Sequence, residues 1–146
     1  MNLSKNVKVS QIRGYYAAGT SARTSSIIDM AGYEGVMFIA NFGTIINTGT
    51  IAFKAQQNTI NSASGMADIS GATKTATVTS TTAAYTQSCM ILDVFQPVEE
   101  FLQVVITPAI QNAVILGVVA IQYSAKDKPP TNDASVLAAL MVQPAA

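Results

Sequence analysis

Histidine and tryptophan are absent from this sequence of 146 residues, and charged residues make up only 11% of it. Without histidine the chain lacks the commonest general base and metal ligand of proteins, which disfavours catalysis and metal binding. Soluble domains average roughly 25% charged residues, whereas Thr, Ser, Asn and Gln replace much of that charge here. Because burying charged groups is costly, such a surface favours a protein that is largely covered by other subunits.

An excess of either charge is also absent, because eight basic and eight acidic residues cancel. The basic residues are scattered and no aromatic residues interleave with them, so the sequence disfavours a nucleic-acid partner. The longest apolar segment, residues 112–123, is too short for a transmembrane helix, and the first residues lack the apolar stretch of a secretory signal. We therefore expect synthesis in the cytoplasm and no membrane partner.

Grouped reactive side chains are missing as well. The one cysteine, Cys89, lies in the apolar stretch SCMILDVF and is predicted to be a small buried hydrophobic residue. Glu99 and Glu100 are adjacent acids, but neighbours on an extended chain point to opposite faces, so we expect a solvated turn. Neither a phosphate-binding loop nor a GxSxG motif is present. The sequence predicts no catalytic, cofactor-binding or metal-binding residue, and a protein that is not an enzyme.

Asp93 interrupts the apolar run MILDVF and allows two interpretations. On a strand its side chain lies on the opposite face from Leu92 and Val94. It is either a buried acid that needs a partner or a solvent-facing residue. We favour the solvent-facing position, with a lysine or arginine on a neighbouring strand as its partner.

Short stretches of β-forming residues, separated by turn signals, follow one another along most of the chain. Residues 3–12 and 50–57 alternate apolar and polar side chains, and residues 35–42 are apolar enough for a central strand with both faces covered. Residues 58–72 are predicted to be a long loop with at most a brief strand, residues 73–81 a Thr-rich strand, and residues 108–113 a hairpin loop. This pattern predicts an all-β protein, an antiparallel, jelly-roll-like β-sandwich. Its expected core residues are Val36, Phe38, Phe53, Ile91, Val104 and Ile106.

The end of the chain differs from this pattern, so we divide the sequence into a sandwich domain, residues 1–125, and a tail, residues 126–146. The tail begins with a charged linker that contains Pro129 and Pro130, and continues with a short helix that Asp133 is expected to cap. A helix this short is unstable alone in water, so it is expected to dock on its own sandwich or on a neighbouring molecule. The candidate partner-contact residues are its apolar side chains, Val136, Leu137, Leu140 and Met141.

Two stretches, DMAGYEGVMF and LDVFQPVEEFLQVVI, resemble a family of small structural proteins of tailed bacteriophages and prophages. The similarity extends over residues 3–125. The resemblance implies a virion component similar to capsid decoration, or cement, proteins. Such a protein would lie on the capsid surface, bind the major capsid protein and other copies of itself, for example as a trimer, and be synthesised in the cytoplasm of a bacterial host.

Three alternatives to a decoration protein remain open at this point. The first is another virion part, a head–tail connector or a tail component. The second is a carbohydrate-binding module, which the absence of tryptophan and the small number of tyrosines make less favourable. The third is a sandwich hydrolase that uses acids such as Asp68 or Asp93.

Overall fold

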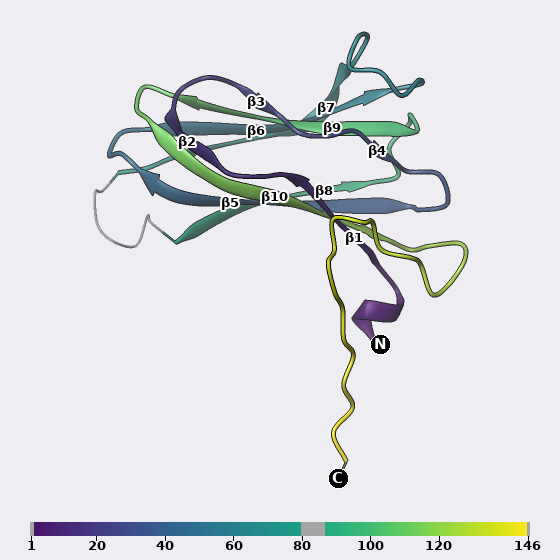
Figure 1. Cartoon of the computed structure of the whole chain (residues 1–146). Coiled ribbons are helices and arrows are strands. Elements are labelled where there is room, and N and C mark those ends of the chain that lie inside the picture. The colour runs from purple at the N-terminus through teal and green to yellow at the C-terminus, as the bar shows by residue number, and fades with distance from the viewer. Residues whose placement is uncertain (1, 80–86, 146) are drawn as a thin grey trace.

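The computed structural model describes residues 2–79 and 87–145, and these residues form a β-sandwich of two antiparallel sheets (Figure 1). The described residues contain one 3₁₀ helix, η1 (Leu3–Lys5), and ten strands. The strands are β1 (Lys8–Arg13), β2 (Tyr16–Gly19), β3 (Arg23–Thr24), β4 (Ile28–Asp29), β5 (Gly35–Ile45), β6 (Thr50–Asn58), β7 (Ala67–Thr77), β8 (Ser88–Phe95), β9 (Phe101–Ala109) and β10 (Ala113–Tyr123).

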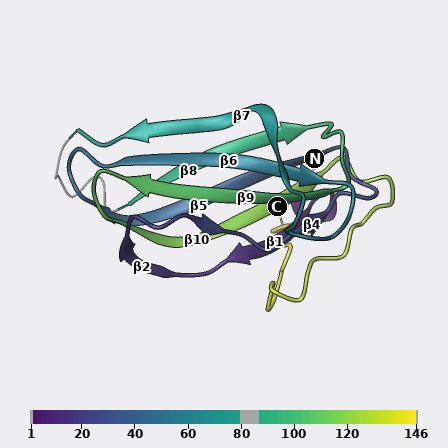
Figure 2. The ribbon, with the colours of Figure 1, turned by 90° about the horizontal axis from the view of Figure 1, so that it is seen from above.

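Strands that are neighbours in the sequence often belong to different sheets. Sheet A has the order β1-β10-β5-β8, with β2 also paired to β10, and sheet B has the order β3-β9-β6-β7, with β4 also paired to β9. The loop of residues 110–112 therefore connects β9 in sheet B to β10 in sheet A, and the predicted hairpin between these strands is wrong. Figure 2 shows β7 and β2 at opposite margins of the sandwich.

The inner faces of the two sheets form one apolar core. Five of the six predicted core residues are confirmed, since Val36, Phe38, Phe53, Val104 and Ile106 are all buried. The sixth prediction is wrong, because Ile91 lies on the outward face of β8 and its side chain is 56% exposed. Its cross-strand neighbour is Ile39, which also points outward from β5. The run SCMILDVF is apolar at odd and even positions, so it does not indicate which positions face the core.

The predicted long loop is shorter than expected. β7 begins at Ala67 and pairs with β6 from Gln57–Ala67 to Thr50–Thr77, with an irregularity between Lys54 and Gln56. Only residues 59–66 connect the two strands, and the Asn58 amide closes this turn by donating to the carbonyl oxygens of Ser62 at 2.9 Å and Ser64 at 3.0 Å. The end of the predicted Thr-rich strand, residues 80–81, lies outside the described residues.

The Tyr16 ring on β2 contacts two cations, one from β1 and one from β3. Tyr16 packs against the core, and the guanidinium carbons of Arg13 and Arg23 lie 4.2 and 4.1 Å from its ring centre. Cation–π attraction thus links β1, β2 and β3, and with them the two sheets.

The predicted C-terminal helix is not supported, because no helix is present among residues 124–145. Asp133 does accept a hydrogen bond from the backbone of Ser135, at 2.9 Å, but only a single turn follows. The Asn132 and Ser135 side chains accept hydrogen bonds from the backbone N–H groups of Val9 and Gln11, at 2.9 and 2.8 Å. This attachment to the edge of β1 replaces helix formation, which a short segment without a packed face cannot sustain.

Candidate interaction surface

The outward face of sheet B carries a network of polar side chains, of which Lys54 and Asp68 are partly exposed and Gln103 is buried. Gln103 donates to Gln56 at 2.7 Å, and Gln56 in turn donates to one oxygen of Asp68 at 2.8 Å. Lys54 binds the other oxygen of Asp68 at 3.0 Å. The hydrogen bonds from Gln56 and Lys54 lower the pKa of Asp68. This network joins β6, β7 and β9.

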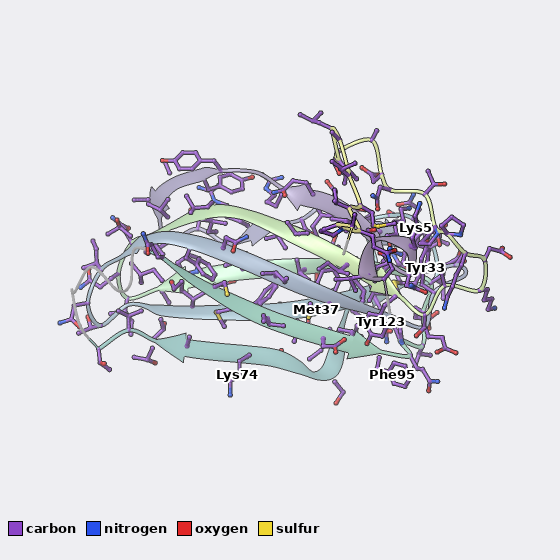
Figure 3. The ribbon with its side chains drawn as sticks, turned by 90° about the horizontal axis from the view of Figure 1, so that it is seen from below. Lys5, Tyr33, Met37, Lys74, Phe95 and Tyr123 are labelled. Carbon is purple, nitrogen blue, oxygen red and sulfur yellow. The ribbon has the colours of Figure 1, made fainter. Side chains whose placement is uncertain are left out.

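The outward face of sheet A is apolar instead. Ile121 pairs with Met37, and Ile39 lies between Val119 and Ile91, so apolar side chains adjoin one another across β10, β5 and β8. Contiguous exposed apolar surface of this kind often marks an interaction site. Figure 3 views this side of the molecule and labels two of its residues, Met37 and Phe95. We call this surface the apolar face, and it consists of Val9, Met37, Ile39, Ile91, Phe95, Leu116, Val119 and Ile121.

A cavity of about 410 Å³ opens at one end of the apolar face. Met37 and Ile121 line it from the sheet, and Leu3 lines it from η1. The segment that follows β10 contributes Ser124 and Lys128. The volume lies within the range of small-ligand sites, about 300–1,000 Å³. Most of the lining surface is apolar, and Asn6, Asp93 and Lys128 add polar or charged groups at its edge. The cavity is therefore suited to apolar side chains.

The polar rim of this cavity is formed by Tyr123 and Asp93. The Tyr123 hydroxyl donates to the Asp93 carboxylate at 2.6 Å, and the aromatic ring lies over Gly35 on the strand between them. The expectation that Asp93 faces solvent is confirmed, but its partner is a tyrosine and not a lysine or arginine. Burial, followed by the hydrogen bond to Asp93, raises the pKa of Tyr123 from 10.0 to about 12.

We expect the hydroxyl of Tyr123 to stabilise the folded chain at neutral pH and to lose this effect in alkali. Because folding raises the pKa of Tyr123 from 10.0 to about 12, the stabilisation is fully present below pH 10 and disappears as the pH rises through about 12. Urea unfolding at a series of pH values should show wild type more stable than Tyr123→Phe at neutral pH, with the difference shrinking across this window. A difference that stays constant would contradict the assigned hydrogen bond.

The structure does not bring the four candidate tail residues together on one face. Val136 is half-buried near the attachment to β1, whereas Leu137 and Leu140 are 97% and 86% exposed and Met141 is 45% exposed. Val142, which the sequence analysis did not include, is also exposed. Figure 1 shows this end of the chain extending away from the sandwich on the side of sheet A. We call residues 137–142 the free tail.

The residues of the apolar face are not individually distinguishable from core residues in the sequence, where Ile91 was predicted to be buried and the others had no predicted role. A signal was present, since residues 36–40, 89–92 and 113–116 are apolar at odd and even positions alike. In a two-layer sandwich only one parity can face the core. The residues at the alternate positions must therefore face outward. On β5 only the inward-facing side chains are fully covered, so the expectation that both faces of this strand are covered is met on the inner face only.

The remaining candidate residues lie at the margins of the molecule. Cys89 is exposed on the outward face of β8, so its predicted burial is wrong. Glu99 and Glu100 lie in the bend between β8 and β9, and a hydrogen bond with Asp29 raises the pKa of Glu100. Within residues 2–79 and 87–145, no three His, Cys, Asp or Glu side chains are grouped as metal ligands. No helix in the described part of the chain has the length and apolar character needed to cross a membrane.

Comparison with known proteins gives a weak likeness of fold. No family model and no curated protein matches the chain. Among solved structures, it is similar to the disulfide-linked pili of Bacillus endospore appendages, with 13% identity, a TM-score of 0.46 and coverage of 86% of this chain and 95% of the other. A CBM4 structure has 10% identity, a TM-score of 0.46 and coverage of 83% and 89%. Eiger TNF from S. frugiperda has 7% identity, a TM-score of 0.35 and coverage of 84% and 98%. These values carry no argument about function.

Proposed function

We propose that this chain is a non-enzymatic structural protein of a bacteriophage virion that decorates the outer surface of the capsid. In this role it binds the major capsid protein and other copies of itself, without contacting nucleic acid or membrane. It acts by covering surface area at many equivalent sites, which stabilises the shell.

The observation that carries this proposal is the contrast between the two outward faces. The Lys54–Asp68 ion pair on sheet B, whose side chains are 31% and 55% exposed, suits a surface that faces water. The apolar face on sheet A, with Ile91 and Phe95 exposed, suits a surface that is covered after assembly. A protein that decorates a shell needs one face that contacts solvent and another that is covered by the shell.

The strand order adds support from the fold. Each sheet combines strands from the beginning, middle and end of the chain, in the orders β1/β2-β10-β5-β8 and β3/β4-β9-β6-β7. This arrangement of two four-strand layers is that of a jelly roll, which recurs in viral capsid and lectin domains. Fold alone does not define function, so the argument rests mainly on the apolar face and on the resemblance of residues 3–125 to phage structural proteins.

Purified particles from a host that produces this chain provide the test. We expect a copy number comparable to that of the major capsid protein, and shells that rupture at lower temperature when the gene is deleted. Supplying the wild-type chain to deleted particles should restore their stability. A copy number that is a small fraction of the capsid protein's would instead favour the head–tail connector or a tail component. Absence from particles would refute a virion role.

A further inference from the structure

We propose that the apolar face of one copy binds the free tail of a second copy, so that neighbouring chains exchange their tails. The inference shares one assumption with the proposed function, namely that the protein works by assembling with other chains. It names one partner for the apolar face, which is residues 137–142 of another identical chain. Their leucine and valine side chains cover the apolar face, and the cavity beside η1 receives part of them.

The free tail exposes apolar side chains that a partner could bury. Leu137 and Leu140 are almost fully exposed, and Val142 is exposed as well. Residues 134–145 contain no charged side chain. An apolar, uncharged segment gains free energy from burial and loses no hydrated charge when it docks.

The apolar face matches this segment in charge and in size. The eight named residues are uncharged; the Asp93 carboxylate, which lies between Ile91 and Phe95 on the outward face of β8, accepts a hydrogen bond from Tyr123, and Lys128 lines the adjoining cavity. Sheet A is four strands wide from β1 to β8, which is about 14 Å at a strand spacing of roughly 4.8 Å. Six extended residues span about 20 Å, so one free tail is long enough to cross the face.

The path of the tail favours a second copy over its own sandwich. Ser135 is held at the outer edge of β1 by its hydrogen bond to Gln11. Beyond this anchor the chain runs away from sheet A, on the side on which the apolar face lies (Figure 1). Because the tail and its binding surface lie on the same side, two or more copies can exchange tails reciprocally and close into a symmetric oligomer. An open filament is not required.

Two variants remove one half of the contact each. Ile91→Asp places a charge on the apolar face, and the double variant Leu137→Asp/Leu140→Asp places charges on the free tail. The matched control for the face is Ile60→Asp, since Ile60 is 59% exposed, much like Ile91, but lies in the β6–β7 loop beyond sheet B. The control for the tail is Gln143→Asp. All of the altered side chains are exposed, so circular dichroism and thermal unfolding should match wild type.

Sedimentation and light scattering of the purified chain give the readout. We expect wild type and both controls to self-associate, and the face and tail variants each to associate about tenfold more weakly or worse, the change that about 1.4 kcal/mol produces. An equimolar mixture of the two defective variants should recover a two-chain species, because the intact tail of one fits the intact face of the other.

Three outcomes overturn the exchange. These are a wild-type chain that stays single at its highest soluble concentration, variants that associate as wild type does, and a mixture that remains two separate monomers. The first and third would mean that the tail folds onto its own sheet or that the face binds a different protein. The result is independent of the count of copies on particles, so the exchange and the capsid role can fail separately.

Discussion

Phe38→Ala is expected to lower the free energy of unfolding by about 3–5 kcal/mol. Phe38 lies on the inner face of β5 and is fully buried. Its cross-strand neighbours are Ala120 on β10 and Leu92 on β8, and the alanine is too small to fill the space that the ring leaves. The residual cavity adds to the loss of buried apolar area. Chemical denaturation with an unchanged dependence on denaturant would measure the effect.

Ile91→Ala provides the matched comparison on the adjacent strand. Because more than half of the Ile91 side chain is exposed, its truncation should change the unfolding free energy of the isolated chain by about 0.5 kcal/mol or less. Similar losses for both variants would mean that β8 presents the opposite face to the core. The pair therefore tests the orientation of β8 directly.

Gly35→Ala is expected to destabilise the chain by about 1–3 kcal/mol, the usual range for overpacking. A Cβ atom at this position would overlap the Cζ atom of Tyr123. The aromatic ring would have to move, and its hydrogen bond to Asp93 would break. Elsewhere in a strand, replacing glycine by alanine is favourable by roughly 0.5–1 kcal/mol, so the sign of the effect is diagnostic.

A double-mutant cycle separates the clash from other effects. In a Tyr123→Ala background the space above Gly35 is empty, and Gly35→Ala should become neutral or stabilising. Thermal and urea unfolding of the four chains gives the coupling between the two positions. Equal destabilisation in both backgrounds would show that Gly35 is needed for its own backbone and not for the ring that covers it.

The sequence was sufficient to predict the architecture where turn residues and β-forming runs alternate. Five of six core residues were placed correctly, among them Phe53, which lies on a strand with alternating apolar and polar side chains, and Phe38, the bulkiest side chain of its apolar run. The pairing of strands could not be predicted from the sequence. The loop of residues 110–112 is as short as a hairpin, yet β9 and β10 pair with β6 and β5 in different sheets. Long-range pairing of this kind depends on the whole core and leaves no local signal.

The candidate interaction surface was predictable only in part. The tail was recognised from its apolar residues, but the helix was not formed, because side chains of Asn132 and Ser135 bind the edge of β1 instead. The apolar face was hidden in runs such as VMFIA, where every residue looks suited to a core. Because the fold has only two layers, half of the residues in such a run must lie on the outer surface.

The opposite placement of the β6–β7 loop and the free tail gives the molecule two distinct poles (Figure 1). Residues 59–66 stand beyond sheet B, whereas residues 137–142 leave from the side of sheet A. When the apolar face is turned toward a supporting surface, the loop points into the surrounding medium. Exposed loop tips tolerate inserted segments, and the Asn58 amide fastens the base of this one. A foreign peptide spliced into the loop would accordingly be presented outward from the supporting surface, where antibodies or receptors can reach it.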